Sequence, residues 1–199
     1  MKYPQTLQNL IECFKKLPGV GEKTAERYAL SCLDINDEIL NLFADSFANI
    51  KEKIGRCKIC NNLSEGDLCE ICKLTDRDKD TICVVDSPKN VVIFEKLGIY
   101  NGLYHVLDGL ISPLDGINPE DIKLNLLLDR IDNENIKEII IAVKPGIEGE
   151  TTSRYISKIL EGKNIKITKI AHGVPLGIDM EYIDALTLEL ALEDRTNIS

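Results

Sequence analysis

Apolar residues in the first part of the chain recur at the three- and four-residue spacing of amphipathic helices. The pattern predicts helices over residues 6–16, 22–33 and 37–54. The dipeptide Pro18-Gly19 separates the first two, because proline cannot continue a helix and glycine readily adopts the backbone conformation that follows a helix end. Residues 1–56 are therefore predicted to form a helical module.

The pattern changes beyond the charged stretch at residues 76–80. Short β-branched runs alternate there with helical stretches, which is typical of a parallel α/β sheet. We expect strands over residues 81–85, 103–106, 138–143 and 165–171, and helices over residues 88–97, 119–131, 151–160 and 184–192. We assign the α/β domain to residues 79–173. The remaining segment, residues 174–199, is a candidate oligomer interface.

Four cysteines between these regions have the spacing of a metal site. Cys57 and Cys60 form one pair, Cys69 and Cys72 form the other, and two residues separate the thiols of each pair. Two such pairs supply four thiolates to one tetrahedral ion, and a closed site of this kind is structural because a catalytic zinc keeps an open position. We expect structural zinc at residues 57–72. Paired disulfides or a redox pair are the alternatives.

The net charge of −9 limits where DNA can bind. Residues 1–56 carry eight acidic and eight basic residues, whereas residues 79–199 carry 20 acidic and 13 basic residues. Any contact with DNA phosphates is therefore expected near the N-terminus, and it should be sensitive to salt. The sequence shows no membrane span and no signal peptide, so a cytoplasmic location is expected.

The turn between the first two helices is the strongest sign of DNA binding. Gly19 and Gly21 permit another backbone to approach closely. The amides of residues 20–23 are expected to open the second helix and point outward, where a phosphate would be attracted. Lys23 and Arg27 are four residues apart and share one face of that helix. A plain helical hairpin is the alternative interpretation.

Three acidic residues follow expected strands of the α/β domain. Asp86 ends the first strand, and Glu148 and Glu150 come after residues 138–143. Open α/β sheets place ligands at the carboxyl ends of their strands, and carboxylates there are able to hold Mg²⁺ for phosphoryl chemistry. An acidic loop and a helix start explain the same residues without a metal. Both interpretations stay open.

The three patterns resemble known modules. The hairpin is similar to the helix-hairpin-helix motif of non-sequence-specific DNA binders, and the acidic set is similar to the Toprim domain. Toprim domains usually carry Glu in the first position and Asp-x-Asp in the second, where this chain has Asp86 and Glu148-x-Glu150. The module order resembles the RecR family of bacterial recombination mediators over essentially the whole chain. Residues 102–107, 111–117 and 171–177 add to the resemblance.

The resemblance implies a DNA-binding mediator of recombinational repair that has no catalytic residues. It implies action with RecO, and in many bacteria with RecF, to load RecA onto single-stranded DNA. It further implies a ring-like homo-oligomer, expected to be a tetramer, that binds single- and double-stranded DNA without sequence specificity. The residues carried over are Gly19, Gly21, Lys23 and Arg27 for DNA, and Asp86, Glu148 and Glu150 for partner proteins.

Two other functions compete with this interpretation. The carboxylates alone would suit a small Mg²⁺-dependent Toprim nuclease. The acidic net charge would suit a zinc-bound interaction module with no role on nucleic acid. The only histidines, His105 and His172, are expected to be structural, because neither has the partners of a known catalytic arrangement.

Overall fold

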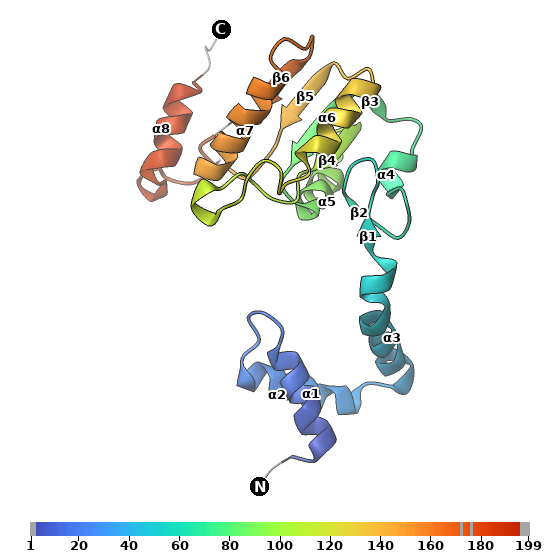
Figure 1. The fold of residues 1–199 in the computed structure, drawn as a ribbon. Coiled ribbons are helices and arrows are strands. Elements are labelled where there is room, and N and C mark those ends of the chain that lie inside the picture. The colour runs from blue at the N-terminus through green and yellow to red at the C-terminus, as the bar shows by residue number, and fades with distance from the viewer. Residues whose placement is uncertain (1–2, 172, 176, 196–199) are drawn as a thin grey trace. The chain divides into compact units, whose positions relative to one another are not determined.

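The computed structural model describes residues 3–171, 173–175 and 177–195, and the chain divides into two compact units, residues 1–53 and 54–199 (Figure 1). The first unit contains α1 (Gln5–Lys15), α2 (Glu22–Ser31) and α3 (Asp37–Lys53), with a 3-10 turn (Cys32–Asp34) before α3. These helices begin and end close to the predicted positions. In the described part of the chain, no helix is both long enough and apolar enough to cross a membrane.

The core of the first unit lies between α1 and α2. Ile11 packs there against Ala25 and Ala29, and the small alanine side chains allow the two helices to approach closely. The rings of Phe14 and Tyr28 meet edge to face, with 5.8 Å between their centroids. The pairing of these helices fixes the turn between them, which is the predicted DNA-binding element.

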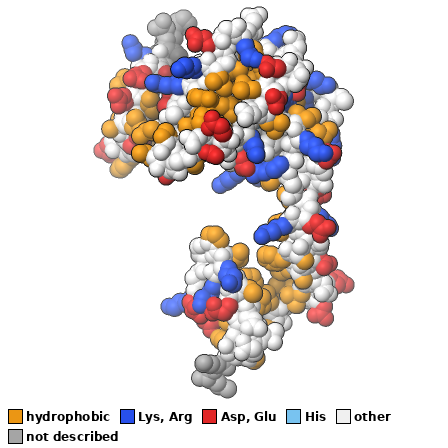
Figure 2. Space-filling model, in the orientation of Figure 1, with side chains coloured by type: hydrophobic (Ala, Val, Ile, Leu, Met, Phe, Trp, Pro, Cys, Tyr) orange, Lys and Arg blue, Asp and Glu red, His pale blue; other side chains and the backbone are white. Residues whose placement is uncertain are grey.

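The third helix, α3, contributes no buried residue to this core. Its apolar face is exposed, and hydrophobic side chains are visible along α3 in Figure 2. The large residues of this face are Ile39, Leu42, Phe43, Phe47 and Ile50. The helical pattern therefore predicted α3 correctly, but the rest of the first unit leaves the apolar face of this helix exposed.

The second unit is built on a four-stranded parallel sheet in the order β4-β3-β5-β6. The strands are β3 (Asp78–Val85), β4 (Gly102–Val106), β5 (Glu138–Ile141) and β6 (Lys166–Lys169). The helices are α5 (Pro88–Leu97), α6 (Leu124–Asn133), α7 (Ile147–Ile159) and α8 (Ala185–Glu193), with 3-10 turns at Pro113–Asp115 and Met180–Tyr182. This arrangement confirms the predicted parallel α/β domain.

Helices cover both faces of the sheet. Along β3, Ile82 and Val84 point into the core formed with α6 and α7, which lie on one side of the sheet (Figure 1). Cys83 and Val85 point into a second, smaller core that includes Val91 of α5. Burial on both faces explains why this strand is a continuous apolar run and does not alternate with polar residues.

Two helices of the α/β domain start at positions that differ from the prediction. Helix α6 begins at Leu124 and not at Pro119, because Lys123 donates its backbone N–H to the Leu107 carbonyl at 2.8 Å and Ile122 is buried. These tertiary contacts hold the preceding residues in turns. Helix α7 begins at Ile147, four residues earlier than predicted, and glutamates in its first turn favour this early start.

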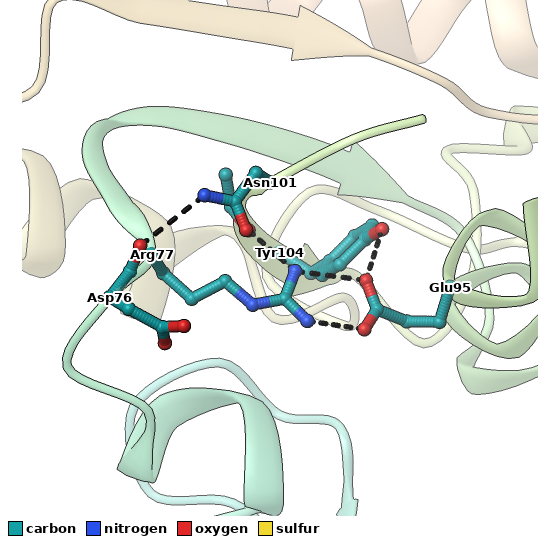
Figure 3. Close-up of polar contacts among 6 residues, drawn as sticks. Asp76, Arg77, Glu95, Asn101 and Tyr104 are labelled. Carbon is teal, nitrogen blue, oxygen red and sulfur yellow. Dashed lines mark hydrogen bonds and ion pairs between the residues drawn. The ribbon is translucent and has the colours of Figure 1, made fainter. Parts of the chain in front are cut away.

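The charged stretch at residues 76–80 is anchored to the sheet and to α5. The Arg77 guanidinium forms a two-pronged ion pair with the Glu95 carboxylate, and the Tyr104 hydroxyl donates to the same carboxylate at 2.8 Å (Figure 3). Arg77 also donates to the Gly102 carbonyl at 3.3 Å. The guanidinium lowers the pKa of Glu95. This stretch is therefore no flexible linker, and β3 begins within it at Asp78.

A buried histidine should make the stability of the protein depend on pH. The Nε2 atom of His105 lies 2.8 Å from the Lys123 carbonyl oxygen and carries the proton, while Nδ1 has no partner within the described structure. Burial lowers the pKa of His105 to about 4. An unfolded histidine titrates near pH 6.5, so the unfolded state binds more protons between about pH 6.5 and 4, and stability falls as the pH falls through that range.

The expected loss reaches about 3 kcal/mol at the acidic end of this window. Urea denaturation of the native protein and of His105→Gln at several pH values measures it. Glutamine retains an N–H for the Lys123 carbonyl but does not titrate, so the difference in unfolding free energy between the two proteins should change steadily over the window. A difference that is constant with pH would contradict the assignment, and zinc release at low pH affects both proteins alike.

Candidate functional site

The four paired cysteines converge on one point of the second unit. Their sulfur atoms all lie within 4.8 Å of one another, and the Sγ atoms of Cys60 and Cys69 are 3.5 Å apart. Tetrahedral zinc with Zn–S bonds of about 2.3 Å requires sulfur atoms about 3.8 Å apart, so the arrangement fits this ion. Cys57, Cys60 and Cys69 are buried and Cys72 is partly exposed. The site is closed and structural.

Short backbone elements hold the thiols in place. The strands β1 (Gly55–Arg56) and β2 (Leu63–Ser64) pair antiparallel, and α4 (Glu70–Lys73) places Cys72 one turn after Cys69. Directly after the second ligand, the Asn61 N–H donates to the Cys57 carbonyl at 2.9 Å. Asn61 has a left-handed backbone with φ 60°, which asparagine tolerates better than most residues.

Crowding separates the pKa values of the cysteine thiols. The neighbouring Cys60 and Cys72 side chains lower the pKa of Cys69, whereas the hydrogen bond to Cys69, together with Cys72 and burial, raises the pKa of Cys60. Four thiols at this spacing therefore cannot all be ionised without a counter-charge. A divalent cation supplies that charge, because metal ligation requires thiolates and releases their protons.

The cysteine module is bonded directly to the edge strand β4. The Cys60 carbonyl accepts the Val106 N–H at 2.8 Å, and the Asn61 side-chain amide donates to the Val106 carbonyl at 2.9 Å. Arg56 adds an ion pair with Asp108 at 2.7 Å. These bonds satisfy backbone groups at the end of an edge strand that would otherwise be open to pairing with another chain. Asn61 was missed in the sequence, although its position inside the metal-binding turn is a usable signal.

The hairpin between α1 and α2 has the predicted form, with one correction. Gly19 has φ +79°, and Gly21 precedes α2 without a side-chain cap. The Val20 N–H does not point outward, because it donates to the Leu17 carbonyl at 3.1 Å. The amides of residues 21–24 make no hydrogen bond within the described residues. The anion-binding end of α2 therefore begins one residue later than expected.

Two exposed cations of α2 accompany these free amides. Lys23 has no ion pair within the described chain, and the Arg27 guanidinium lies 5.5 Å from the centre of the Tyr28 ring. Beside them, Lys15 contacts Glu22 at 2.6 Å, and Glu22 raises the pKa of Lys15. This ion pair occupies the first turn of α2 and was not foreseen from the sequence. This face of α2 is therefore positively charged, and the acidic Glu22 partly neutralises it.

The three acidic residues of the α/β domain are not gathered into one group of ligand atoms in the described structure. Among the described residues, the four cysteines are the only group of three or more potential ligands close enough to share an ion. Asp86 accepts hydrogen bonds from Asn90 at 2.8 Å and from the Lys144 N–H at 3.2 Å. Glu150 pairs with Lys169 at 2.8 Å. The predicted His172 lies outside the described residues.

The fold and the site together define a class of protein: a DNA-binding protein made of a helical hairpin, a structural zinc module and a Toprim domain. Family models match four successive parts of the chain. They are the RecR helix-hairpin-helix (residues 7–50), the RecR four-cysteine zinc finger domain (54–73), the Toprim domain (80–171) and the RecR C-terminal model (173–196). The chain belongs to the RecR family, which gives it the role of a recombination mediator in DNA repair.

Removing one zinc ligand should release the metal. Cys60→Ser is expected to lower the zinc content from about one ion per chain to less than about half, because serine is a poor zinc ligand and the site needs four thiolates. Elemental analysis of the purified protein measures this. Cys13→Ser, at an exposed position on α1, is the matched control and should retain its zinc. Equal zinc content in the two variants would contradict the ligand assignment.

Asn61 should stabilise the protein through both its side chain and its backbone. Asn61→Gly removes the hydrogen bond to Val106 but keeps a left-handed backbone accessible, and we expect a loss of about 1–2 kcal/mol in unfolding free energy. Asn61→Ala should lose roughly 1 kcal/mol more, because alanine is strained in this conformation. Urea denaturation of the zinc-loaded variants measures both. Equal losses would show that the backbone conformation contributes nothing.

Proposed function

We propose that this protein binds DNA phosphates through the hairpin and acts with RecO to load RecA onto single-stranded DNA. The observation that carries the proposal is the coincidence of unbonded amides at residues 21–24 with the exposed cations Lys23 and Arg27. Such a surface takes phosphate oxygens and does not read base edges, so binding to single- and double-stranded DNA without sequence specificity follows.

The protein is proposed to have no catalytic activity, and the engaged Toprim acids support this. Asp86 is bonded to the loop after β5, and Glu150 is paired with a lysine of β6. Two-metal phosphoryl transfer needs carboxylates that converge on the ions. The acids Asp86, Glu148 and Glu150 are proposed instead as contacts for partner proteins, with RecO first and RecF as a further candidate.

The exposed apolar face of α3 supports the proposal of a homo-oligomer. Monomeric proteins rarely leave a continuous stripe of large apolar side chains in water, and this stripe includes Leu42 and Phe47, which are 61% and 66% exposed. A ring, expected to be a tetramer, would bring several hairpins to one DNA molecule. Weak contacts from each copy would then add up through multivalency.

Replacing both cations of the hairpin should weaken DNA binding. We expect Lys23→Ala/Arg27→Ala to reduce affinity for single-stranded DNA by about tenfold or more, and to reduce the slope of log K against log salt by roughly one to two. Fluorescence anisotropy with a labelled oligonucleotide at several salt concentrations measures both. Lys89→Ala/Lys96→Ala, on α5 of the other unit, is the matched control.

The same samples, incubated with Mg²⁺ and run on a denaturing gel, test the absence of catalysis. Intact DNA is expected. Cleaved DNA would support the nuclease alternative, and unchanged affinity in the hairpin variant with zinc retained would favour an interaction module that does not bind DNA.

A further inference from the structure

One edge of the parallel sheet has no partner strand. Strand β6 pairs only with β5, and within the described residues no other strand lies beyond it. The N–H groups of Lys166 and Ile170 donate to the chain of β5 at 2.8 Å and 3.0 Å. Because backbone groups alternate along a strand, those of Ile167 and Lys169 point away from the sheet. Within the described residues they make no hydrogen bond, so they are available to pair with another extended chain.

A groove runs alongside this edge, between β6 and α7. Its floor is apolar and is formed by Leu160, Ile165 and Ile167. Its rim carries the cations Arg154 and Lys158 on α7 and Lys163 in the turn that leads to β6, together with one acidic residue, Glu161. A chain added beside β6 would therefore lie between an apolar floor and basic side chains.

Two of the basic residues along this groove lack an acidic partner. Lys163 pairs with Asp132, and the edge residue Lys166 pairs with Glu138 at 3.0 Å. Arg154 and Lys158 are exposed, and no hydrogen bond or ion pair to either is found in the described chain. They are four residues apart on α7, where like charges repel each other.

The position of these cations is unusual for this domain, because residues 79–199 carry more acidic than basic residues. Lys158 alone is explained by the last turn of α7, where a cation stabilises the helix dipole. Arg154 lies in the middle of the helix, four residues after Glu150, whose carboxylate forms its ion pair with Lys169. An acidic partner would relieve the repulsion between the two side chains.

We infer that this groove binds an extended acidic segment of a partner protein, which pairs with β6 as an added strand. The outward N–H and C=O groups supply backbone hydrogen bonds. Every second side chain of the added strand points to the α7 face, where the floor takes apolar side chains and Arg154 and Lys158 select acidic ones. Nucleic acid fits less well. The groove offers no aromatic side chain for base stacking, and carbonyl groups at a strand edge repel phosphates.

The test uses the full-length zinc-loaded protein and a fluorescent peptide of about eight residues, which is within the usual length of a strand. Isoleucine and aspartate take turns at every second position and threonine fills the others, so that the apolar and acidic side chains share one face. Anisotropy should show saturable binding. Arg154→Glu/Lys158→Glu should weaken it by about tenfold or more, because two attractive contacts become repulsive. The matched control Lys89→Glu/Lys96→Glu reverses two exposed cations of α5, on the opposite face of the sheet, and should bind the peptide as the native protein does.

A second probe separates strand addition from charge attraction alone. The same peptide with N-methyl groups on alternate amides cannot donate to β6, and its binding should be weakened by a similar factor. Equal binding of both peptides, absence of binding, or equal losses in the two charge-reversal variants would overturn the inference. Arg154→Glu/Lys158→Glu should also leave oligonucleotide binding unchanged. Weaker oligonucleotide binding in this variant, without an effect on the peptide, would assign the groove to nucleic acid.

Discussion

The attachment of the zinc module to strand β4 is the contact on which the second unit depends. Two short strands and one helical turn bury too little apolar surface to fold alone, so the module depends on the metal for its stability. The ligand Cys60 and its neighbour Asn61 are in turn hydrogen-bonded to Val106. Metal binding is therefore coupled to the end of an edge strand. Where the chain leaves the zinc module, the ion pair between Arg77 and Glu95 holds it against α5. Both ends of the zinc module are therefore attached to the α/β domain.

An acidic protein is able to bind DNA because its charges are distributed and paired locally. The net charge of −9 is an average over the chain, and some of its acidic groups, such as Asp108, Glu138 and Glu150, are already engaged in ion pairs. On the hairpin, by contrast, Lys23 and the amides at the start of α2 have no partner within the described residues. At physiological salt, exposed charges more than about 8 Å apart are largely screened from each other. Attraction to nearby charges therefore outweighs repulsion from distant ones. The local surface therefore decides which ligand is bound, and the total charge mainly weakens the affinity.

Short-range patterns predicted much of this structure. The paired cysteines indicated the metal site, because ligand geometry fixes their spacing. Helical and strand periodicities indicated the hairpin and the parallel sheet. The errors arose where distant contacts override local preference. Helix α6 starts late because residues 122–123 are held by the sheet, and the Arg77–Glu95 pair joins positions that no local pattern connects. The inward Val20 amide likewise depends on a turn geometry that composition does not specify.

The acidic positions of the Toprim domain are tied into the packing at the carboxyl ends of the strands. Asp86 joins the ends of β3 and β5 through the Lys144 amide, and Glu150 joins α7 to β6 through Lys169. Gly149 lets the first turn of α7 approach the Lys144 carbonyl so closely that an added Cβ would lie 2.0 Å from its oxygen. This close packing orders the carboxyl ends of the strands. An acidic surface ordered in this way would suit the proposed contact with partner proteins, because complementary charges fix the register of an interface.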